Sequence, residues 1–546
     1  MNRREFLSST MAAGLPTPSF GAGTRPNILI ILADDLGWSD LGCFGGEIHT
    51  PNMDKLAQGG VRFTQFYSYA RCCPARSSIM TGLYPHQVGM GNMTNAKPRT
   101  DFPGYAGILN DRNVTIPEVL KKAGYSTWMT GKWHLGPPGP VGRGFDEYYG
   151  MVHGFDSFWD STKYTRLPAD RKARTYPDGG FYATNAITDH TLDFLADARK
   201  QSKPFFFYLA YNSPHFPLHA PKDVIDKYVP VYEKGWDYVR EKRFERMRAM
   251  GLIRKEWKFT PRSEIPPNRF NTQTGWAGKT NPAWDSIEPD RQKDLARRMA
   301  IFAAMVEIMD RNIGRVVEDL RANKQLDNTL ILFFSDNGAC AEWDPWGFDK
   351  SSGPQNELHR GDALAGMGQP GTYHSYGSGW ANACNTPWRL YKHYNHEGGI
   401  SSPLVAHWPA GMKRQNAIDH HPAHVIDLMP TCVELAKASY PPSMPPMEGR
   451  SLVPALAGKP VKRDAIYWEH EGNRAIRIGK WKAVAVEPAG KWELYDMEAD
   501  RTEMNDLAAR QPERVKSMVR QWEQWAKRSN VVPWMWKPQY QSEEEQ

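Results

Sequence analysis

Three continuous apolar runs along the chain each end in a short polar segment. The runs span residues 26–33, 204–211 and 329–334 and consist mostly of aliphatic and aromatic side chains. Runs of this uniformity are typical of strands that are buried on both faces of a mostly parallel sheet. An amphipathic stretch at 295–320 predicts a long helix that covers such a sheet. The pattern therefore predicts an α/β fold.

Weaker patterns predict the remaining elements of this fold. Further strands are expected at 63–69, 125–129 and 403–408, and further helices at 52–59, 115–123, 182–198 and 427–436. Thr115 and Glu118 have the spacing of a capping box, so the helix that follows them should begin there.

The C-terminal part of the chain has a different pattern. After a proline-rich linker at 441–446, short alternating segments predict antiparallel strands and one helix, at 465–467, 474–478, 482–486, 493–495 and 512–527. Two polar, irregular stretches at 221–290 and 341–385 are interpreted as insertions. We expect an α/β domain over 25–440 that contains both insertions, and a smaller subdomain over 441–546.

Charge and composition narrow the class of partner. The 68 basic and 61 acidic residues give a net charge of +7, which is a weak attraction for anionic substrates and no nucleic-acid signature at this length. The 20 Trp and 23 Tyr indicate surfaces that can stack against sugar or aryl rings, although most large aromatic side chains belong to cores. The six cysteines follow neither a disulfide-scaffold nor a zinc spacing.

The N-terminus resembles an export signal. Asn2-Arg3-Arg4-Glu5-Phe6-Leu7 is similar to the twin-arginine motif, and a mildly apolar stretch follows to Gly23. That stretch is too short and too interrupted to span a bilayer, so no stable membrane insertion is expected. We interpret residues 1–24 as a twin-arginine signal peptide that the export machinery reads, which predicts a periplasmic or secreted bacterial protein. A basic disordered tail is the alternative.

Polar side chains suited to a site follow the apolar runs. Asp34 and Asp35 come directly after the first run, and Asp336 and Asn337 come after the third. The carboxyl ends of central strands are where open α/β sheets build their sites. Adjacent carboxylates at the end of so apolar a strand are costly unless a positive charge neutralises them. A divalent metal ion is one candidate, and a solvated Asp-Asp turn is the other interpretation.

A cysteine lies at a predicted strand-to-helix turn. The strand at 63–69 leads into a turn at Pro74 and then a helix, which places Cys72 just before a helix N-terminus. The unpaired amides and the dipole there favour a negative charge beside Cys72. The alternative is a buried Cys72-Cys73 pair with a structural role only.

Two further segments carry basic side chains after predicted strands. Lys132 and His134 are two residues apart, and on an extended segment they would point to the same side and reach one anion. His215 lies between two prolines after the second apolar run, which restricts its freedom. His219, four residues further on, is a weaker candidate.

A C-x-P-x-R motif and five further elements, spread over residues 26–508, resemble those of the type I, formylglycine-dependent sulfatases of the alkaline phosphatase superfamily. Cys72, Pro74 and Arg76 match the C-x-P-x-R signature, and Thr81-Gly82 with Tyr84-Pro85 continues it. The other elements are D-D-x-G at Asp34, G-K-W-H-x-G at Gly131, N-S-P-H-x-P at Asn212, D-N-G at Asp336, and W-R-x-x-K with E-G-G from Trp388 to Gly399. The likeness is strongest to bacterial arylsulfatase-like members.

The resemblance implies a role for each site residue. Cys72 would be converted to formylglycine, whose hydrate is the nucleophile and also contacts the metal ion, and Arg76 would hold the modified residue. The metal ligands would be Asp34, Asp35, Asp336 and Asn337, an all-oxygen set that suits Ca²⁺ or Mg²⁺ rather than Zn²⁺. Calcium is the usual ion of the family. Lys132 would bind the sulfate or the hydrate, and His215 would contact the sulfate group or the leaving oxygen. Lys392 would bridge the sulfate and the leaving group, and His134 would be the base that acts on the hydrate.

The same resemblance implies the fold and the partners. It predicts a large mixed, mostly parallel sheet sandwiched by helices, with a C-terminal four-stranded antiparallel sheet and a packed helix. The predicted function is hydrolysis of sulfate monoesters of aryl or carbohydrate alcohols, after maturation by a formylglycine-generating enzyme. The chain departs from many relatives at Ser401-Ser402, where they have an arginine. Two alternatives remain open: a phosphonate monoesterase or phosphodiesterase on the same site, and a non-catalytic binder of sulfated glycans.

Overall fold

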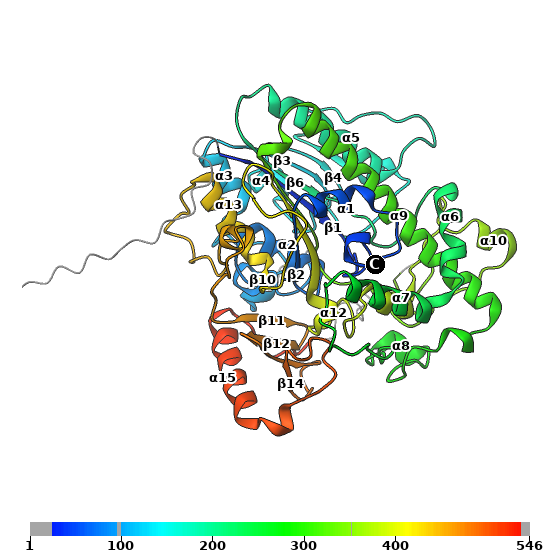
Figure 1. Ribbon diagram of the computed structural model, residues 1–546. Coiled ribbons are helices and arrows are strands. Elements are labelled where there is room, and N and C mark those ends of the chain that lie inside the picture. Colours follow the sequence, from blue (N-terminus) through cyan, green and yellow to red (C-terminus); the bar gives the residue numbers. More distant parts are fainter. Residues whose placement is uncertain (1–24, 95–99, 351, 537–546) are drawn as a thin grey trace, which may run out of the picture.

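A ten-stranded mixed sheet forms the centre of the molecule (Figure 1). The computed structural model describes residues 25–94, 100–350 and 352–536, so the predicted signal peptide lies outside the described residues. The strand order is β10-β2-β8-β7-β1-β6-β3-β4-β5, with β9 paired to β2. In chain order the strands are β1 (Asn27–Ala33), β2 (Val61–Tyr67), β3 (Ser126–Gly131), β4 (Glu147–Gly150), β5 (Thr165–Leu167), β6 (Phe205–Ala210), β7 (Thr329–Ser335), β8 (Ser401–His407), β9 (Ala417–Asp419) and β10 (Ala423–His424).

The pairing directions of the strands bring several carboxyl ends to the same edge of the sheet. β1 runs parallel to β6 and β7, and β3 runs parallel to β6. β8 is antiparallel to both β7 and β2, so β2 points the same way as β7. The carboxyl ends of β1, β2, β3, β6 and β7 therefore lie along one edge of the sheet, where α/β folds place their sites.

Alternating side chains of β1 enter two separate hydrophobic cores. Leu29 and Ile31 face one core, and Ile28 and Ile30 face the other, because successive strand residues point to opposite faces. The first core is covered by α1 (Pro51–Gln58), α5 (Ala183–Arg199) and α9 (Pro289–Ala322), and the second by α2 (Cys72–Thr81), α3 (Ile116–Lys122) and α13 (Leu428–Ala436) (Figure 1). Helices on both faces explain why the central strands are apolar throughout.

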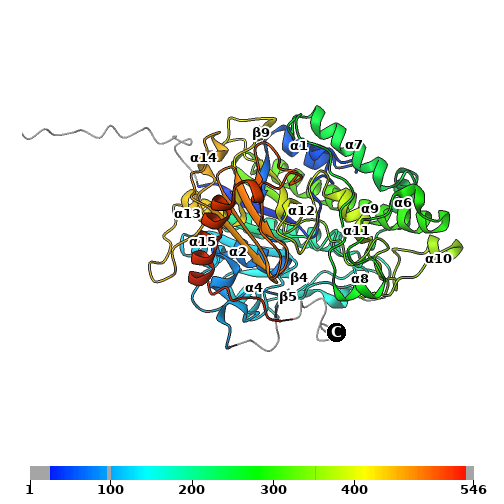
Figure 2. The same ribbon diagram turned by 90° about the horizontal axis from the view of Figure 1, so that it is seen from below.

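A four-stranded antiparallel sheet and a helix lie at one end of the molecule (Figures 1 and 2). They comprise β11 (Ile466–His470), β12 (Asn473–Ile478), β13 (Trp481–Ala485), β14 (Glu493–Asp496) and α15 (Pro512–Arg528). The Trp525 ring of α15 stacks on Tyr467 with a centroid distance of 5.1 Å. The predicted fold class is thus confirmed in both sheets.

The segment 221–290 is not irregular, and the prediction that it is was wrong. It contains α6 (Lys222–Tyr232), α7 (Gly235–Ala249) and α8 (Arg269–Gln273). The helical character of α7 was hidden in the sequence because its buried residues include two arginines, Arg240 and Arg243. The second segment, 341–385, is mostly irregular but includes α10 (Gly361–Ala365) and α11 (Gly377–Cys384). The remaining helices are α4 (Gly139–Gly142), α12 (Glu397–Ile400) and α14 (Val453–Leu456).

None of the helices in the described part of the chain has the length and apolar character needed to cross a membrane.

Candidate active site

Acidic side chains from two neighbouring strands meet at the carboxyl edge of the sheet. Asp34 and Asp35 follow β1, and Asp336 and Asn337 follow β7; all four are buried. The Asn337 Nδ2 group donates to Asp35 Oδ1 at 2.6 Å, and the Asp35 amide donates to Asp336 Oδ1 at 3.3 Å. The register of the parallel pair sets Ala33 opposite Ser335, so residues far apart in sequence become neighbours here.

Three buried cations surround these carboxylates. Arg76 of α2 contacts Asp336 Oδ2 through Nε at 3.0 Å and Nη2 at 2.9 Å. Lys132 Nζ lies 2.6 Å from Asp34 Oδ2, and Lys392 Nζ lies 2.9 Å from Asp35 Oδ2. Each carboxylate thus has at least one basic partner, which compensates the cost of burying it.

Opposing effects act on the carboxyl pKa values. Burial raises the pKa of Asp34, but the positive charges of Lys132, His215 and Arg76 outweigh it, and the net shift is downward. The pKa of Asp336 is raised, first by burial and then by the charge of Asp34 beside it. A positive charge placed between the two would favour the ionised form of both.

The oxygen atoms of this cluster fit a divalent cation. Asp34 Oδ1 and Asn337 Oδ1 are buried without a hydrogen-bond partner among the described residues, which is unusual for interior polar atoms. Ligand atoms of Asp34, Asp35 and His215 lie within 4.8 Å of one another. Carboxylate and amide oxygens form a hard donor set, which suits Ca²⁺ or Mg²⁺.

Cys72 is the first residue of α2, with Arg71 as its N-cap. The prediction that Cys72 lies just before the helix is therefore corrected by one position, because the loop after β2 already turns helical at Cys72.

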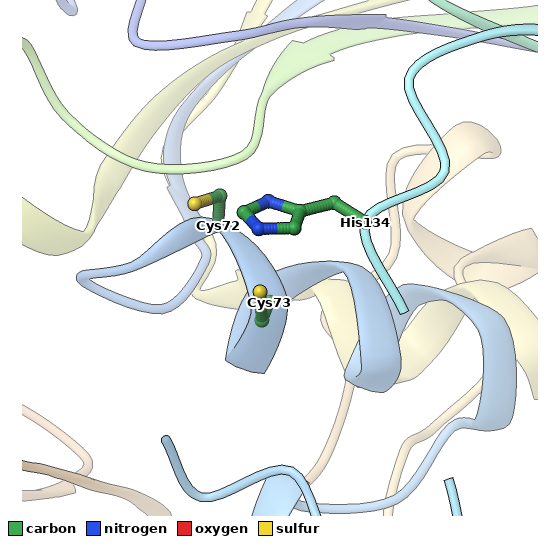
Figure 3. Close-up of side chains that lie close together, drawn as sticks. All are labelled: Cys72, Cys73 and His134. Carbon is green, nitrogen blue, oxygen red and sulfur yellow. The ribbon is translucent and has the colours of Figure 1, made fainter. Parts of the chain in front are cut away.

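Cys72 lies in a small cluster of side chains. Cys72, Cys73 and His134 have ligand atoms within 4.8 Å of one another, and Figure 3 shows the His134 ring beside both sulfur atoms. A hydrogen bond with Cys73 lowers the pKa of the Cys72 thiol and outweighs the opposing effect of burial, with further lowering by Lys132. The six cysteines are all free and buried among the described residues.

Lys132 and His134 reach the site differently from the prediction. The strand β3 ends at Gly131, and His134 has a positive φ of 52°, so the two residues do not share an extended segment. Lys132 instead points to Asp34, and His134 points to Cys72. Burial lowers the pKa of His134 to about 4, so its ring is neutral at pH 7 and has a lone pair available.

His215 joins the cluster from the loop after β6. Its Nδ1–H donates to the Phe216 carbonyl oxygen at 2.6 Å, which fixes the ring and directs Nε2 inward. Nε2 lies 3.4 Å from Asp35 Oδ2 and 3.5 Å from Lys392 Nζ. His219, the weaker candidate, bonds instead to the Thr372 carbonyl and the Phe158 amide.

A pocket beside the site is lined by residues that the motifs did not identify. Arg71, Glu342 and Trp343 line it together with Lys392. Arg71 could have been suspected because it precedes Cys72. Glu342 and Trp343 lie in the irregular segment 341–385, where no sequence pattern distinguishes one polar residue from another.

Comparison with known proteins defines the class. The sulfatase family model matches residues 26–438, and the model of the N-sulphoglucosamine sulphohydrolase C-terminal region matches 388–528. An uncharacterised sulfatase of Schizosaccharomyces pombe is 35% identical, covering 93% of this chain and 94% of its own. The arylsulfatase of Klebsiella aerogenes is 34% identical over 76% of this chain and 87% of its own. The crystal structure of Ps i-CgsB, which is also known in complex with k-i-k-neocarrahexaose, has a TM-score of 0.65 at 26% identity and covers 95% of this chain and 94% of its own.

The fold and the buried site thus define a hydrolase of the alkaline phosphatase superfamily. Within it, the chain belongs to the sulfatase family and is an enzyme that hydrolyses sulfate esters.

Proposed function

We propose that the enzyme cleaves sulfate monoesters of aryl or carbohydrate alcohols at Cys72, in its formylglycine form, beside one divalent cation. The observation that carries the proposal is the buried cluster in which Cys72, three carboxylates and three cations converge on one edge of the sheet. Calcium is the proposed ion, held by Asp34, Asp35, Asp336 and Asn337, with the modified Cys72 side chain as an additional contact.

The cation and the formylglycine would supply two kinds of chemistry. When bound, the cation would neutralise sulfate oxygens, and the hydrated aldehyde would provide one hydroxyl for attack on sulfur and a second through which sulfate is released. Everything else rests on the protein's own side chains.

The basic residues are placed to hold the ester. Lys132 and Lys392 are buried next to the carboxylates and can donate to sulfate oxygens where charge develops. Arg76 of α2 links Asp336 to the segment after β3, because its Nη1 also donates to the Lys132 carbonyl at 2.7 Å. Fixed groups of this kind lose little freedom when the substrate binds.

The two histidines are placed for proton transfer. His134 is neutral near pH 7 and faces Cys72, so it can accept the proton of the hydrate. His215 Nε2 and Lys392 Nζ lie side by side near Asp35. Lys392, or His215 once Nε2 has taken up a proton, can deliver a proton to the departing alcohol.

Cys72→Ser tests the nucleophile. The hydroxyl of the variant can accept a sulfo group but has no second hydroxyl through which to release it, so a covalently sulfated peptide should accumulate and turnover should stop. The measurement is the mass of the peptide containing position 72 after incubation with 4-nitrophenyl sulfate. A fully active variant would contradict the mechanism.

Wild-type turnover of an aryl phosphonate monoester, compared with turnover of the aryl sulfate, measures how far the site excludes phosphoryl substrates.

Export and maturation complete the proposal. Residues 1–24 would be a twin-arginine signal peptide, residues 25–440 the catalytic domain and residues 441–546 a C-terminal subdomain. A formylglycine-generating enzyme would act on Cys72 in the host. Intact Met1 on protein isolated from the periplasm would contradict the signal peptide, and an unmodified Cys72 in active protein would contradict the maturation step.

A further inference from the structure

One short segment contacts both of the histidines that are assigned to proton transfer. It follows β4 and spans residues 152–155. The Met151 carbonyl accepts the Trp133 amide at 3.0 Å, and the Val152 carbonyl accepts the His134 amide at 3.2 Å. The backbone that carries His134 is therefore paired with the start of segment 152–155.

Gly154 lies against the His134 ring. A Cβ atom added to Gly154 would lie 2.9 Å from both Cε1 and Nε2 of His134. Non-bonded carbon atoms are about 3.5–4.0 Å apart at their optimal separation, so an alanine here would push the ring away by at least about 0.5 Å. The φ angle of Gly154 is not positive, so the backbone itself accepts alanine. The contact with His134 is therefore what an alanine would change.

Phe155 covers one face of the His215 ring. The two rings are nearly parallel, at 14°, with a centroid distance of 5.9 Å. Phe155 is 41% exposed, whereas His215 is 4% exposed. The Phe155 ring also packs on Phe216 with a centroid distance of 5.1 Å, and the Phe216 carbonyl accepts the His215 Nδ1–H. Phe155 therefore lies on the solvent side of His215 and restricts the plane of its ring.

The chain is held beyond this segment as well. The Phe158 amide donates to His219 Nδ1 at 3.3 Å, and the Phe158 carbonyl accepts the Ala183 amide at 2.8 Å. His219 belongs to the same loop as His215. Gly154 and Phe155 thus lie on a stretch that is hydrogen-bonded to the His134 backbone on one side and to the His215 loop on the other.

We propose that segment 152–155 positions the two histidines for separate steps of the reaction. Gly154 sets the place of His134 for the release of sulfate, and Phe155 sets the place of His215 for the departure of the alcohol. The inference rests on the proposed function. Neither Gly154 nor Phe155 carries a group that can transfer a proton, so both are positioning residues.

The two steps differ in the bonds that change. In the first, the attacking hydroxyl gives up one proton and bonds to sulfur, the S–O bond to the alcohol breaks, and the alcohol oxygen takes up one proton beside His215 and Lys392. In the second, His134 accepts the proton of the remaining hydroxyl, the C=O bond re-forms and the C–O bond to sulfate breaks. A displaced His134 therefore slows the second step, and a displaced His215 slows the first.

Gly154→Ala tests the position of His134. The mature enzyme with its cation is mixed rapidly with 4-nitrophenyl sulfate, and the release of nitrophenol and of sulfate is measured. We expect a first turnover of nitrophenol within about threefold of the wild-type rate, followed by sulfate release at least about tenfold slower than in the wild type. The peptide containing position 72 should then carry a sulfo group. The control is His153→Ala, an exposed neighbour in the same segment, which should keep wild-type kinetics in both phases.

Phe155→Ala tests the position of His215. The substrates are phenyl sulfates of similar size whose phenols differ in pKa. Protonation matters most for the most basic leaving oxygen, so kcat/KM should fall at least about tenfold more for the phenol of highest pKa than for 4-nitrophenol. Phe155→Leu keeps an apolar cover and should restore part of the loss. The control is Tyr238→Ala, which removes a ring of the same 41% exposure on α7 and should leave the series unchanged.

The two roles can be overturned separately. Wild-type kinetics in Gly154→Ala, equal slowing of both its phases, or loss of its fold overturns the role of Gly154. A loss in Phe155→Ala that is uniform across the phenyl sulfates overturns the role of Phe155, because a lost contact with the substrate ring would affect all of them alike. A mature wild-type enzyme that hydrolyses none of these esters overturns the proposed function instead.

Discussion

At the scale of single residues, buried charges define this protein. Arg76 is fully buried, and its guanidinium contacts Asp336 while donating to the Lys132 carbonyl. The C-x-P-x-R spacing identifies Cys72 and Arg76 because both lie on one short helix. It does not reveal that Arg76 contacts Asp336, 260 residues later in the chain.

Replacing Arg76 should destabilise the fold as well as the site. In Arg76→Met, a buried carboxylate loses its partner, so we expect the free energy of unfolding to fall by about 3–5 kcal/mol. Added Ca²⁺ should restore part of this loss, because it would replace the missing positive charge. Urea unfolding with and without Ca²⁺ measures both effects.

Arg199→Met is the control for that experiment. Its partner Asp319 is partly solvent-exposed, so the change should cost less than about 1 kcal/mol. Equal losses in the two variants would mean that the buried cluster contributes no special stability.

At the scale of elements, apolar strands were predictable and a charged helix was not. The strands β1, β6 and β7 were located within one or two residues, because uniform apolar runs have few alternative structures. The capping box at Thr115 and Glu118 is present at the start of α3. The helix α7 was missed because it buries Arg243, whose Nη1 contacts Asp40 Oδ1 at 2.6 Å and whose Nη2 contacts Glu47 Oε1 at 2.7 Å.

Arg243 should tie the segment 221–290 to the site. Asp40 accepts the Gly37 amide at 2.7 Å, so it shapes the loop that follows Asp34 and Asp35. In Arg243→Met we expect a loss of about 3–5 kcal/mol in unfolding free energy, because Asp40 stays buried without its partner. Thermal and urea unfolding measure this loss, and kcat/KM for an aryl sulfate should fall as well.

Arg248→Met provides the comparison within the same helix. Arg248 is exposed, donates to the Lys255 carbonyl and lies over the Phe244 ring, so its replacement should lower the free energy of unfolding by no more than about 0.5 kcal/mol. If both variants behave alike, α7 is not a structural support of the site.

At the scale of the whole molecule, buried polar networks join the two sheets. Glu397 of α12 binds Lys482 of β13 at 2.9 Å and Arg501 at 2.6 Å, and all three side chains are fully buried. The Trp468 indole of β11 also donates to the Ser68 carbonyl, close to the loop that leads to Cys72. The small sheet is therefore packed directly against the segment that leads to Cys72.

Buried histidines should limit stability in acid. Burial lowers the pKa of His190 to about 4, and its Nε2 accepts the Arg174 amide while Nδ1–H donates to the Ala186 carbonyl. Because the folded pKa is below the unfolded value, this stability is fully present above about pH 6.5 and is lost as pH falls through 4. The loss should reach about 3 kcal/mol for this residue.

His190→Gln isolates that contribution. The variant cannot titrate, so its melting temperature should fall less steeply than that of the wild type between pH 7 and pH 4. His219 also has one accepting and one donating ring nitrogen, and burial lowers its pKa to about 4 as well. Part of the dependence of the melting temperature on pH should therefore remain in the variant. If the melting temperatures of wild type and variant fall equally with pH, His190 makes no contribution to the loss of stability in acid.

The sequence by itself determined the central strands, about half of the α-helices and the residues that carry the motifs, because these depend on local periodicity and short spacing. Cys72 with Arg76, and Asp34 with Asp35, could be identified from the chain alone. The tertiary structure decided which distant residues meet: Lys132 with Asp34, Lys392 with Asp35, and Arg71 with Glu342. These contacts depend on strand order and loop paths, which no local pattern encodes. Cys72, one of six cysteines in the chain, is the first residue of α2 and lies beside these charged side chains.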